Sequence, residues 1–366
     1  MKKRFLIPII ICILMLIVNI IARNSQSFSD FYVQNIFPFI SDVFSRISGL
    51  VKFSVGEILI ILGIIAVAVG FPLFLILMLV KKGSRKKVAG IFGCAYLWIF
   101  TYIFTTETMN CFIMYHCTTF SERYFGNGSE RSEEQLTELY AMLAEKSNQL
   151  AMEVPRDEEN RFIVTCDYLS EAKSAMAKTA QKYEQLSGYY PNAKPIQFSY
   201  FMSQSNLLGV YFPFSMESNF NKDVINSNLP STICHEYSHL KGIIQEDEAN
   251  FISFIATTEC EDPQFQYSGY LNALEYVHNE VYEQQIESAY YITDLISDEV
   301  KSDWFRFLPD NYWEENEDKE IISTETVETA ASAAIDTNIK LNGREDGEKA
   351  YSMVVNLLLD YYCSTN

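Results

Sequence analysis

Three long apolar segments in the first third of the chain constrain its fold more than any other feature. Residues 58–80 carry no charge, and a stretch of this length can span a bilayer with some tilt. Residues 5–22 are apolar apart from Asn19, and residues 88–106 form a third apolar run that is barely long enough to span. We expect each of the three to form a transmembrane helix.

The first of these segments has an alternative interpretation as a cleaved signal peptide, because a Lys-Lys-Arg run at residues 2–4 precedes it. Its apolar core is long, however, and residues 20–22 (Ile-Ile-Ala) form a poor cleavage site. We therefore interpret it as an uncleaved membrane helix.

The basic residues predict the orientation in the membrane. Short loops rich in Lys and Arg stay in the cytoplasm, and both the N-terminus and residues 81–87 (KKGSRKK) are strongly basic. Three crossings then place the chain after Glu107 outside. We predict a multi-pass protein of the cell membrane, with an anchor over residues 1–106 and an extracytoplasmic domain over residues 107–366.

Charge and cysteine content exclude some classes of function. The net charge of −19 argues against nucleic acid as a partner. The apolar segments indicate that the lipid bilayer is a partner. None of the eight cysteines forms a CxxC pair, so a zinc site built from cysteines is not expected. We expect most of the cysteines to be unpaired and buried.

Residues 235–239 read HEYSH, an instance of the HExxH motif. His235 and His239 are four residues apart, so on a helix they lie on one face and can reach one metal ion. Glu236 can hold a water molecule bound to that metal. The motif is short, and the plain alternative is an amphipathic helix with two incidental histidines.

The flanking residues favour the metal site over that alternative. Residues 229–232 (LPST) offer a helix start, with Ser231 or Thr232 as the capping residue. Gly242 follows the second histidine by three residues and can turn the chain out of the helix.

A second helix is expected to open on three acidic residues at 246–248, which suit a helix N-terminus. It can supply the ligand that two histidines lack, because catalytic zinc commonly takes three protein ligands, and two His with one Glu is a known set. We favour Glu246 as that ligand, and Glu248, on a different face, is the alternative. Asn250 shares a face with Glu246 and could support the site by hydrogen bonding.

These motifs resemble a known group of enzymes. HExxH followed by E-x-x-A-D/N is the signature of the gluzincin metallopeptidases. The wider run of GVYFPF at residues 209–214, HEYSHLKG and EDEANF resembles the bacterial membrane family catalogued as domain of unknown function 3810, from the first membrane segment to the C-terminus. The resemblance implies a zinc peptidase in the membrane, but no substrate. His239 and Glu246 are closer in sequence than the corresponding ligands of many gluzincins.

Alternating residues predict strands at 195–202 and 209–212. By the resemblance, the second is the edge strand over the metal, to which an extended peptide substrate adds by backbone hydrogen bonds. The alternative is an ordinary hairpin strand of the core. The edge-strand residues would be Gly209, Val210, Tyr211 and Phe212.

The remaining segments are predicted to be mostly helical. A capping box at residues 132–135 (SEEQ) opens the first helix. Two weaker catalytic candidates, which would stabilise the oxyanion, are His278 and Tyr351. The expected helices span residues 132–152, 155–183, 267–300, 330–341 and 348–362.

The sequence thus predicts a mainly α protein, with three transmembrane helices and an α+β, gluzincin-like (zincin) domain that has a small sheet and the HExxH helix. The expected function is zinc-dependent hydrolysis of a protein or peptide substrate, in which Glu236 activates a water molecule bound to Zn²⁺. The alternative is a membrane sensor or binding module that holds zinc without catalysis.

Overall fold

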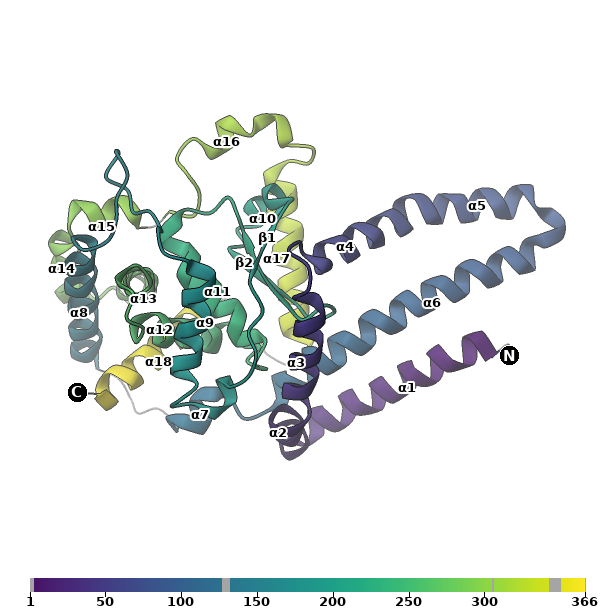
Figure 1. Cartoon of the computed structure of the whole chain (residues 1–366), viewed down its shortest axis with the longest axis horizontal. Helices are drawn as coiled ribbons and strands as arrows, with labels where there is room; N and C mark the ends of the chain where they lie inside the picture. Colours follow the sequence, from purple (N-terminus) through teal and green to yellow (C-terminus); the bar gives the residue numbers. More distant parts are fainter. Residues whose placement is uncertain (1–2, 127–131, 305, 342–349, 366) are drawn as a thin grey trace. The chain divides into compact units, whose positions relative to one another are not determined.

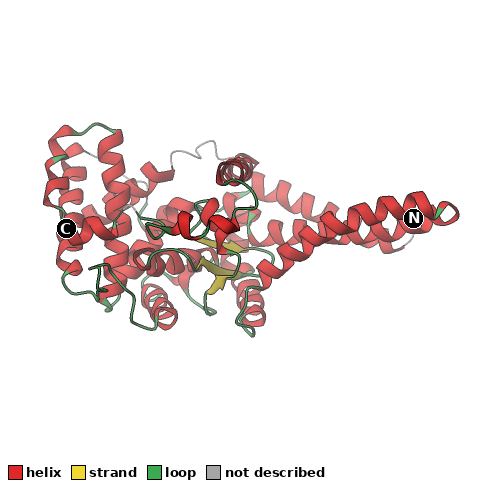
Figure 2. Ribbon diagram, turned by 90° about the horizontal axis from the view of Figure 1, so that it is seen from above, coloured by secondary structure: helices red, strands yellow, loops and turns green. Residues whose placement is uncertain are grey.

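The computed structural model describes residues 3–126, 132–304, 306–341 and 350–365. The protein is mainly helical, and its strands form one small sheet (Figure 2). Contacts divide the chain into two compact units. The first unit comprises Met1–Cys117 and Phe212–Glu217, and the second comprises Thr118–Tyr211 and Ser218–Asn366.

The first unit contains the apolar helices. Its elements are α1 (Lys3–Asn24), α2 (Gln26–Asn35), α3 (Phe37–Ser48), α4 (Val55–Ile65), the π-helical η1 (Ala66–Gly70), α5 (Phe71–Val80), η2 (Lys82–Ser84), α6 (Arg85–Asn110) and η3 (Phe112–His116). Among the described residues, three helical stretches are long and apolar enough to cross a membrane: Lys3–Asn24, Val55–Val80 and Lys82–His116. The prediction of three such helices is confirmed, whereas their orientation in the cell stays a prediction.

Helices α1 and α6 run parallel within this unit (Figure 1). Near one end, the Cys94 thiol lies 3.7 Å from the carbonyl of Arg4. Near the other, Asn19 donates to the hydroxyl of Thr108 at 2.7 Å. The basic residues Lys3 and Arg4 at the start of α1 and the basic α5–α6 connection therefore lie at the same end of the spans. This is the arrangement that three successive crossings require.

The second unit surrounds a helical core. Its helices and turns are α7 (Phe120–Tyr124), α8 (Glu133–Ala151), α9 (Tyr168–Thr179), η4 (Glu184–Leu186), α10 (Ser199–Gln204), η5 (Asn226–Asn228), α11 (Leu229–His239), α12 (Glu246–Thr258), α13 (Pro263–Glu283), η6 (Glu287–Ala289), α14 (Tyr291–Leu295), α15 (Asp298–Asp303), α16 (Tyr312–Glu315), η7 (Glu317–Lys319), α17 (Thr324–Leu341) and α18 (Ala350–Thr365). Helix α12 packs against α11, α13 and α18. Its side chains Phe251 and Ile252 are fully buried there, as are Tyr237 of α11 and Leu274 of α13.

The sheet has three strands in the order β1-β3-β2. They are β1 (Lys194–Ile196), β2 (Gly209–Phe212) and β3 (Glu217–Asn221). β1 is parallel to β3, with Lys194 opposite Asn219 and Ile196 opposite Asn221. Because the end of β3 bonds to the residue before β2 (Asn221 N to Leu208 O, 2.7 Å), β2 runs antiparallel to β3 and forms an edge of the sheet in the described chain.

Several predicted elements are wrong in extent. Of the helix expected over residues 155–183, only the part in α9 forms. The strand expected over residues 195–202 ends with β1 at Ile196, and α10 follows it. The helix expected over residues 267–300 begins earlier and stops at Glu283, followed by the short η6, α14 and α15. The capping box at residues 132–135 is confirmed at the start of α8.

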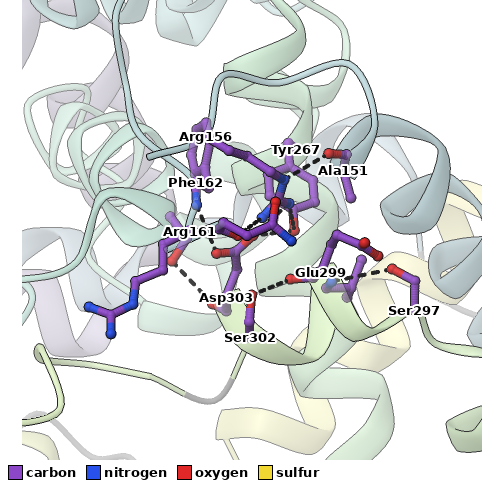
Figure 3. A network of polar contacts seen from close by, with 12 residues as sticks. Ala151, Arg156, Arg161, Phe162, Tyr267, Ser297, Glu299, Ser302 and Asp303 are labelled. Atoms are coloured by element: carbon purple, nitrogen blue, oxygen red, sulfur yellow. Dashed lines mark hydrogen bonds and ion pairs between the residues drawn. The ribbon is translucent and has the colours of Figure 1, made fainter. Parts of the chain in front are cut away.

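A buried carboxylate explains why no helix forms over residues 155–167. Asp303, at the end of α15, accepts hydrogen bonds from Arg156 at 2.9 Å, the Phe162 backbone N–H at 3.0 Å and the Tyr267 hydroxyl at 2.8 Å (Figure 3). Asp303 is 6% exposed, and a buried charge needs such donors. The conformation of residues 155–167 therefore depends on Asp303, a residue far along the chain. The apolar spacing within the segment could not reveal this.

Candidate metal site

Helix α11 carries the HExxH motif and begins earlier than the sequence suggested. Pro230 lies in its first turn, where proline is favoured because the N–H it lacks would be unpaired anyway. The predicted caps Ser231 and Thr232 are therefore wrong, because both lie inside the helix. The Ser231 hydroxyl instead lies 2.8 Å from that of Ser268 in α13.

The chain turns sharply between α11 and α12. Gly242 has φ +83°, a left-handed conformation that glycine adopts without steric cost. The turn brings the first residue of α12, Glu246, back to the histidines of α11. His235, His239 and Glu246 each offer one ligand atom, and these atoms all lie within 4.8 Å of one another. The Nε2 atoms of His235 and His239 are 3.1 Å and 3.9 Å from the carboxylate of Glu246.

Hydrogen bonds on the far side of each imidazole orient the two rings. The Nδ1 atom of His235 lies 2.7 Å from Oδ1 of Asn250, and Nδ1 of His239 lies 2.6 Å from the carbonyl of Ile243. Both partners are acceptors, so Nδ1 carries the hydrogen in each ring. The lone pair of the neutral ring is therefore on Nε2, which faces Glu246. This is the tautomer that a metal ligand needs.

Burial and charge shift the pKa values of the two histidines in opposite directions. Desolvation alone would lower the pKa of His235, but the hydrogen bond to Glu246 and its charge outweigh it and raise the pKa to about 9. Burial lowers the pKa of His239 to about 4. Desolvation would raise the pKa of Glu246, yet the hydrogen bond from His235 holds it below the usual range. The Glu246 side chain is 60% exposed, so its desolvation is incomplete. The hydrogen bond from His235 therefore determines that the pKa of Glu246 is lowered. At neutral pH His235 thus carries a second proton, on Nε2, and a cation must displace it.

Glu236 is buried beside the cluster, with 4% of its surface exposed. Burial raises the pKa of its carboxyl to about 8. Among the described residues, its Oε2 atom has no hydrogen-bond partner. A buried carboxylate oxygen without a partner is costly, and a cation or a water molecule at the cluster would offset that cost.

Strand β2 passes close to Glu236. A Cβ atom on Gly209 would lie 2.5 Å from Oε1 of Glu236 and 2.8 Å from the methyl group of Thr232. Only glycine therefore fits here. The ring of Tyr211, further along β2, lies 5.8 Å from the ring of His239. Val210, between Gly209 and Tyr211 in the strand, is half-buried. The last residue of β2, Phe212, belongs to the first unit and packs against Gly56 of α4.

Glu248, the alternative ligand, lies away from the cluster. It accepts hydrogen bonds from the backbone N–H and the hydroxyl of Ser121 at 3.0 Å and 2.5 Å. It therefore anchors α7, and the cluster contains Glu246 instead.

Of the two oxyanion candidates, His278 is not part of the cluster. His278 of α13 lies 2.6 Å from the hydroxyl of Tyr140 and packs against Tyr282 and Trp304, and burial lowers its pKa to about 4. Tyr351 lies near the start of α18, and its side chain is outside the described residues.

Two contributors to the site escaped prediction. The carbonyl of Ile243 has no side-chain signature, because any residue can supply it. The close approach of Gly209 to Glu236 was only weakly indicated by the sequence, through a glycine at the start of the predicted strand that precedes the HExxH motif.

A family model described as Protein of unknown function (DUF3810) matches residues 32–359. The chain belongs to this family, whose description assigns no activity. A search of curated proteins and a search of solved structures each gave no match.

Proposed function

We propose that this family member is a membrane-anchored zinc metallopeptidase with a gluzincin-like catalytic domain. The proposal rests on one observation above all. Two imidazoles with their Nδ1 atoms engaged direct Nε2 toward a carboxylate. Beside them lies the buried Glu236, one oxygen of which has no hydrogen-bond partner within the described part of the chain. These residues fit a zinc ion with His235, His239 and Glu246 as ligands and one position open to water.

When bound, zinc supplies a water molecule of lowered pKa and a Lewis acid for the scissile carbonyl. The chain's own groups then divide the remaining work. Glu236 accepts the proton of the attacking water and passes it to the leaving amine. Without a cation the carboxyl of Glu236 has a raised pKa, and a nearby positive charge favours its ionised, proton-accepting form.

Strand β2 is suited to hold the substrate. As an edge strand it can pair with an extended peptide through backbone groups. Gly209 lets the strand approach Glu236 closely, so that a peptide bound along β2 passes the cluster. We propose that the substrate is a protein or peptide, and that this domain acts outside the cytoplasm.

The test uses the full chain purified in detergent. We expect one zinc per chain and chelator-sensitive cleavage of a peptide library. Glu236→Gln should keep the zinc and lose cleavage, because an amide cannot accept the proton. His239→Ala should lose the zinc.

A wild-type protein that binds zinc but cleaves nothing in the library would instead support a zinc-binding sensor. Wild-type cleavage rates in the Glu236→Gln variant would contradict the proposed mechanism.

A further inference from the structure

Helix α3 has its polarity reversed relative to a helix of a water-soluble protein. The side that it buries consists of three serines, Ser41, Ser45 and Ser48, together with Phe37. The Ser45 hydroxyl donates to the carbonyl of Met216 at 3.2 Å within the same unit. A surface helix in water places its apolar stripe toward the core and its polar residues outside. In α3 the small polar residues face the protein.

The opposite side of α3 is apolar and exposed. Phe39 and Ile47 are 73% and 62% exposed, and helical periodicity places both of them away from the serines. Phe44, which is 39% exposed, lies at the border between this face and the buried one. The face continues into the following loop, where Leu50 and Phe53 are 83% and 50% exposed. Soluble proteins rarely leave contiguous apolar surface of this kind uncovered, and such patches mark membrane or protein contacts.

A polar edge separates the buried and exposed faces. Asp42 and Arg46, one turn apart, form an ion pair at 2.9 Å. Both side chains are substantially exposed, at 39% and 58%. α3 thus has a wide apolar face bordered by a charged edge, the pattern of a helix that lies in the plane of a membrane interface.

The position of α3 identifies what covers its apolar face. It lies in the connection between two membrane-spanning helices, and the second of them begins at Val55, seven residues after α3 ends. The preceding helix, α2, is fixed at the ends of the spans, because Tyr32 donates to the carbonyl of Met109 at 2.8 Å and Ser29 to that of Ala22 at 3.4 Å. Because α3 follows α2 directly and precedes the span that begins at Val55, it lies next to the level at which the spans leave the bilayer.

We propose that α3 is an interfacial helix whose face of Phe39 and Ile47 is buried in the lipid bilayer at the boundary between headgroups and acyl chains. Such helices insert by about 5–10 Å. Arg46 can then reach the headgroups while its stem covers apolar surface. Through Ser45, the same helix holds the turn that follows β2 at the membrane surface. This inference is independent of the metal site.

The test places a fluorescent reporter on the helix in the full chain, reconstituted into phospholipid nanodiscs. Ile47→Trp is the probe, Phe39→Trp is a second probe in case the first misfolds, and Asp42→Trp on the charged edge is the matched control. The signal of the parent protein, with its own three tryptophans, is subtracted. Helical circular dichroism confirms folding.

We expect the Ile47→Trp and Phe39→Trp signals to be blue-shifted and strongly quenched by lipids brominated near the headgroup end of the acyl chain. Quenching should be weaker with bromines near the chain terminus. The Asp42→Trp signal should instead be quenched by aqueous acrylamide. If both face probes are quenched by acrylamide and not by brominated lipid, the face is in water and the proposal is wrong. If they resist both quenchers, a protein surface covers α3, which also overturns it.

Discussion

The hydrogen bond between Asn250 and His235 gives the most specific prediction about the proposed zinc site. Asn250→Ala removes the acceptor 2.7 Å from Nδ1 of His235. The His235 side chain is only 15% exposed, so water cannot freely replace that acceptor. The ring can then turn, or move its proton to Nε2, where it blocks the metal.

Two estimates of the magnitude agree. Leaving a buried donor unpaired costs about 1–3 kcal/mol. Hydrogen-bond partners of ligating histidines are worth about 10–100-fold in metal affinity, which corresponds to roughly 1.4–2.7 kcal/mol. We therefore expect Asn250→Ala to weaken zinc binding about 10–100-fold.

Zinc affinity would be measured by competition with a chromophoric chelator on the full chain in detergent. Asn250→Asp is the matched variant that keeps an acceptor, and it should bind zinc at least as tightly as the parent. Asn192→Ala removes an exposed amide that accepts from Lys173, and it controls for the loss of any asparagine. Equal affinities for Asn250→Ala and the parent, or equal losses in the Ala and Asp variants, would refute the reasoning.

Further predictions concern pH, the edge strand and the fold. Because the pKa of His235 is raised to about 9, zinc affinity should fall at least about tenfold for each unit that pH drops from 9 to 7. The carboxyl of Glu236, whose pKa is raised to about 8, should also lose its proton when zinc binds nearby, so calorimetry in buffers of different ionisation enthalpy should show about two protons released per zinc near pH 7. No release would contradict the protonated state of His235. Gly209→Ala should displace Glu236, because Oε1 of Glu236 would be 2.5 Å from the new Cβ. Peptide cleavage should therefore drop while zinc affinity stays the same. Unchanged cleavage would mean that β2 has room to move. Asp303→Ala leaves the guanidinium of Arg156, which is 12% exposed, without its carboxylate partner and should lower the free energy of unfolding by about 3–5 kcal/mol. Denaturant titration measures this change. A decrease of less than about 1 kcal/mol would show that the ion pair is effectively solvated.

The three long apolar helices were predictable because the thickness of a bilayer alone sets the length that was sought. The run from residue 58 to residue 80 has no charge, and no tertiary contact is needed to interpret it. The two histidines were predictable for a similar reason, since helical periodicity places residues four apart on one face.

The choice between Glu246 and Glu248 was not decided by the sequence. Both open the same helix, and the outcome depends on Ser121, 127 residues before Glu248, which binds that carboxylate. His278 likewise looked available for chemistry, but its ring packs against Trp304 and binds Tyr140. Long-range partners of this kind leave no local pattern.

The most direct test of the metal site is X-ray absorption at the zinc edge on the zinc-loaded full chain. We expect two imidazole nitrogens at about 2.0–2.1 Å together with oxygen donors at about 2.0–2.2 Å. His235→Ala should lose either the zinc or one of the two imidazole nitrogens. Sulfur donors at about 2.3 Å, or a spectrum unchanged in His235→Ala, would contradict a site made by His235, His239 and Glu246.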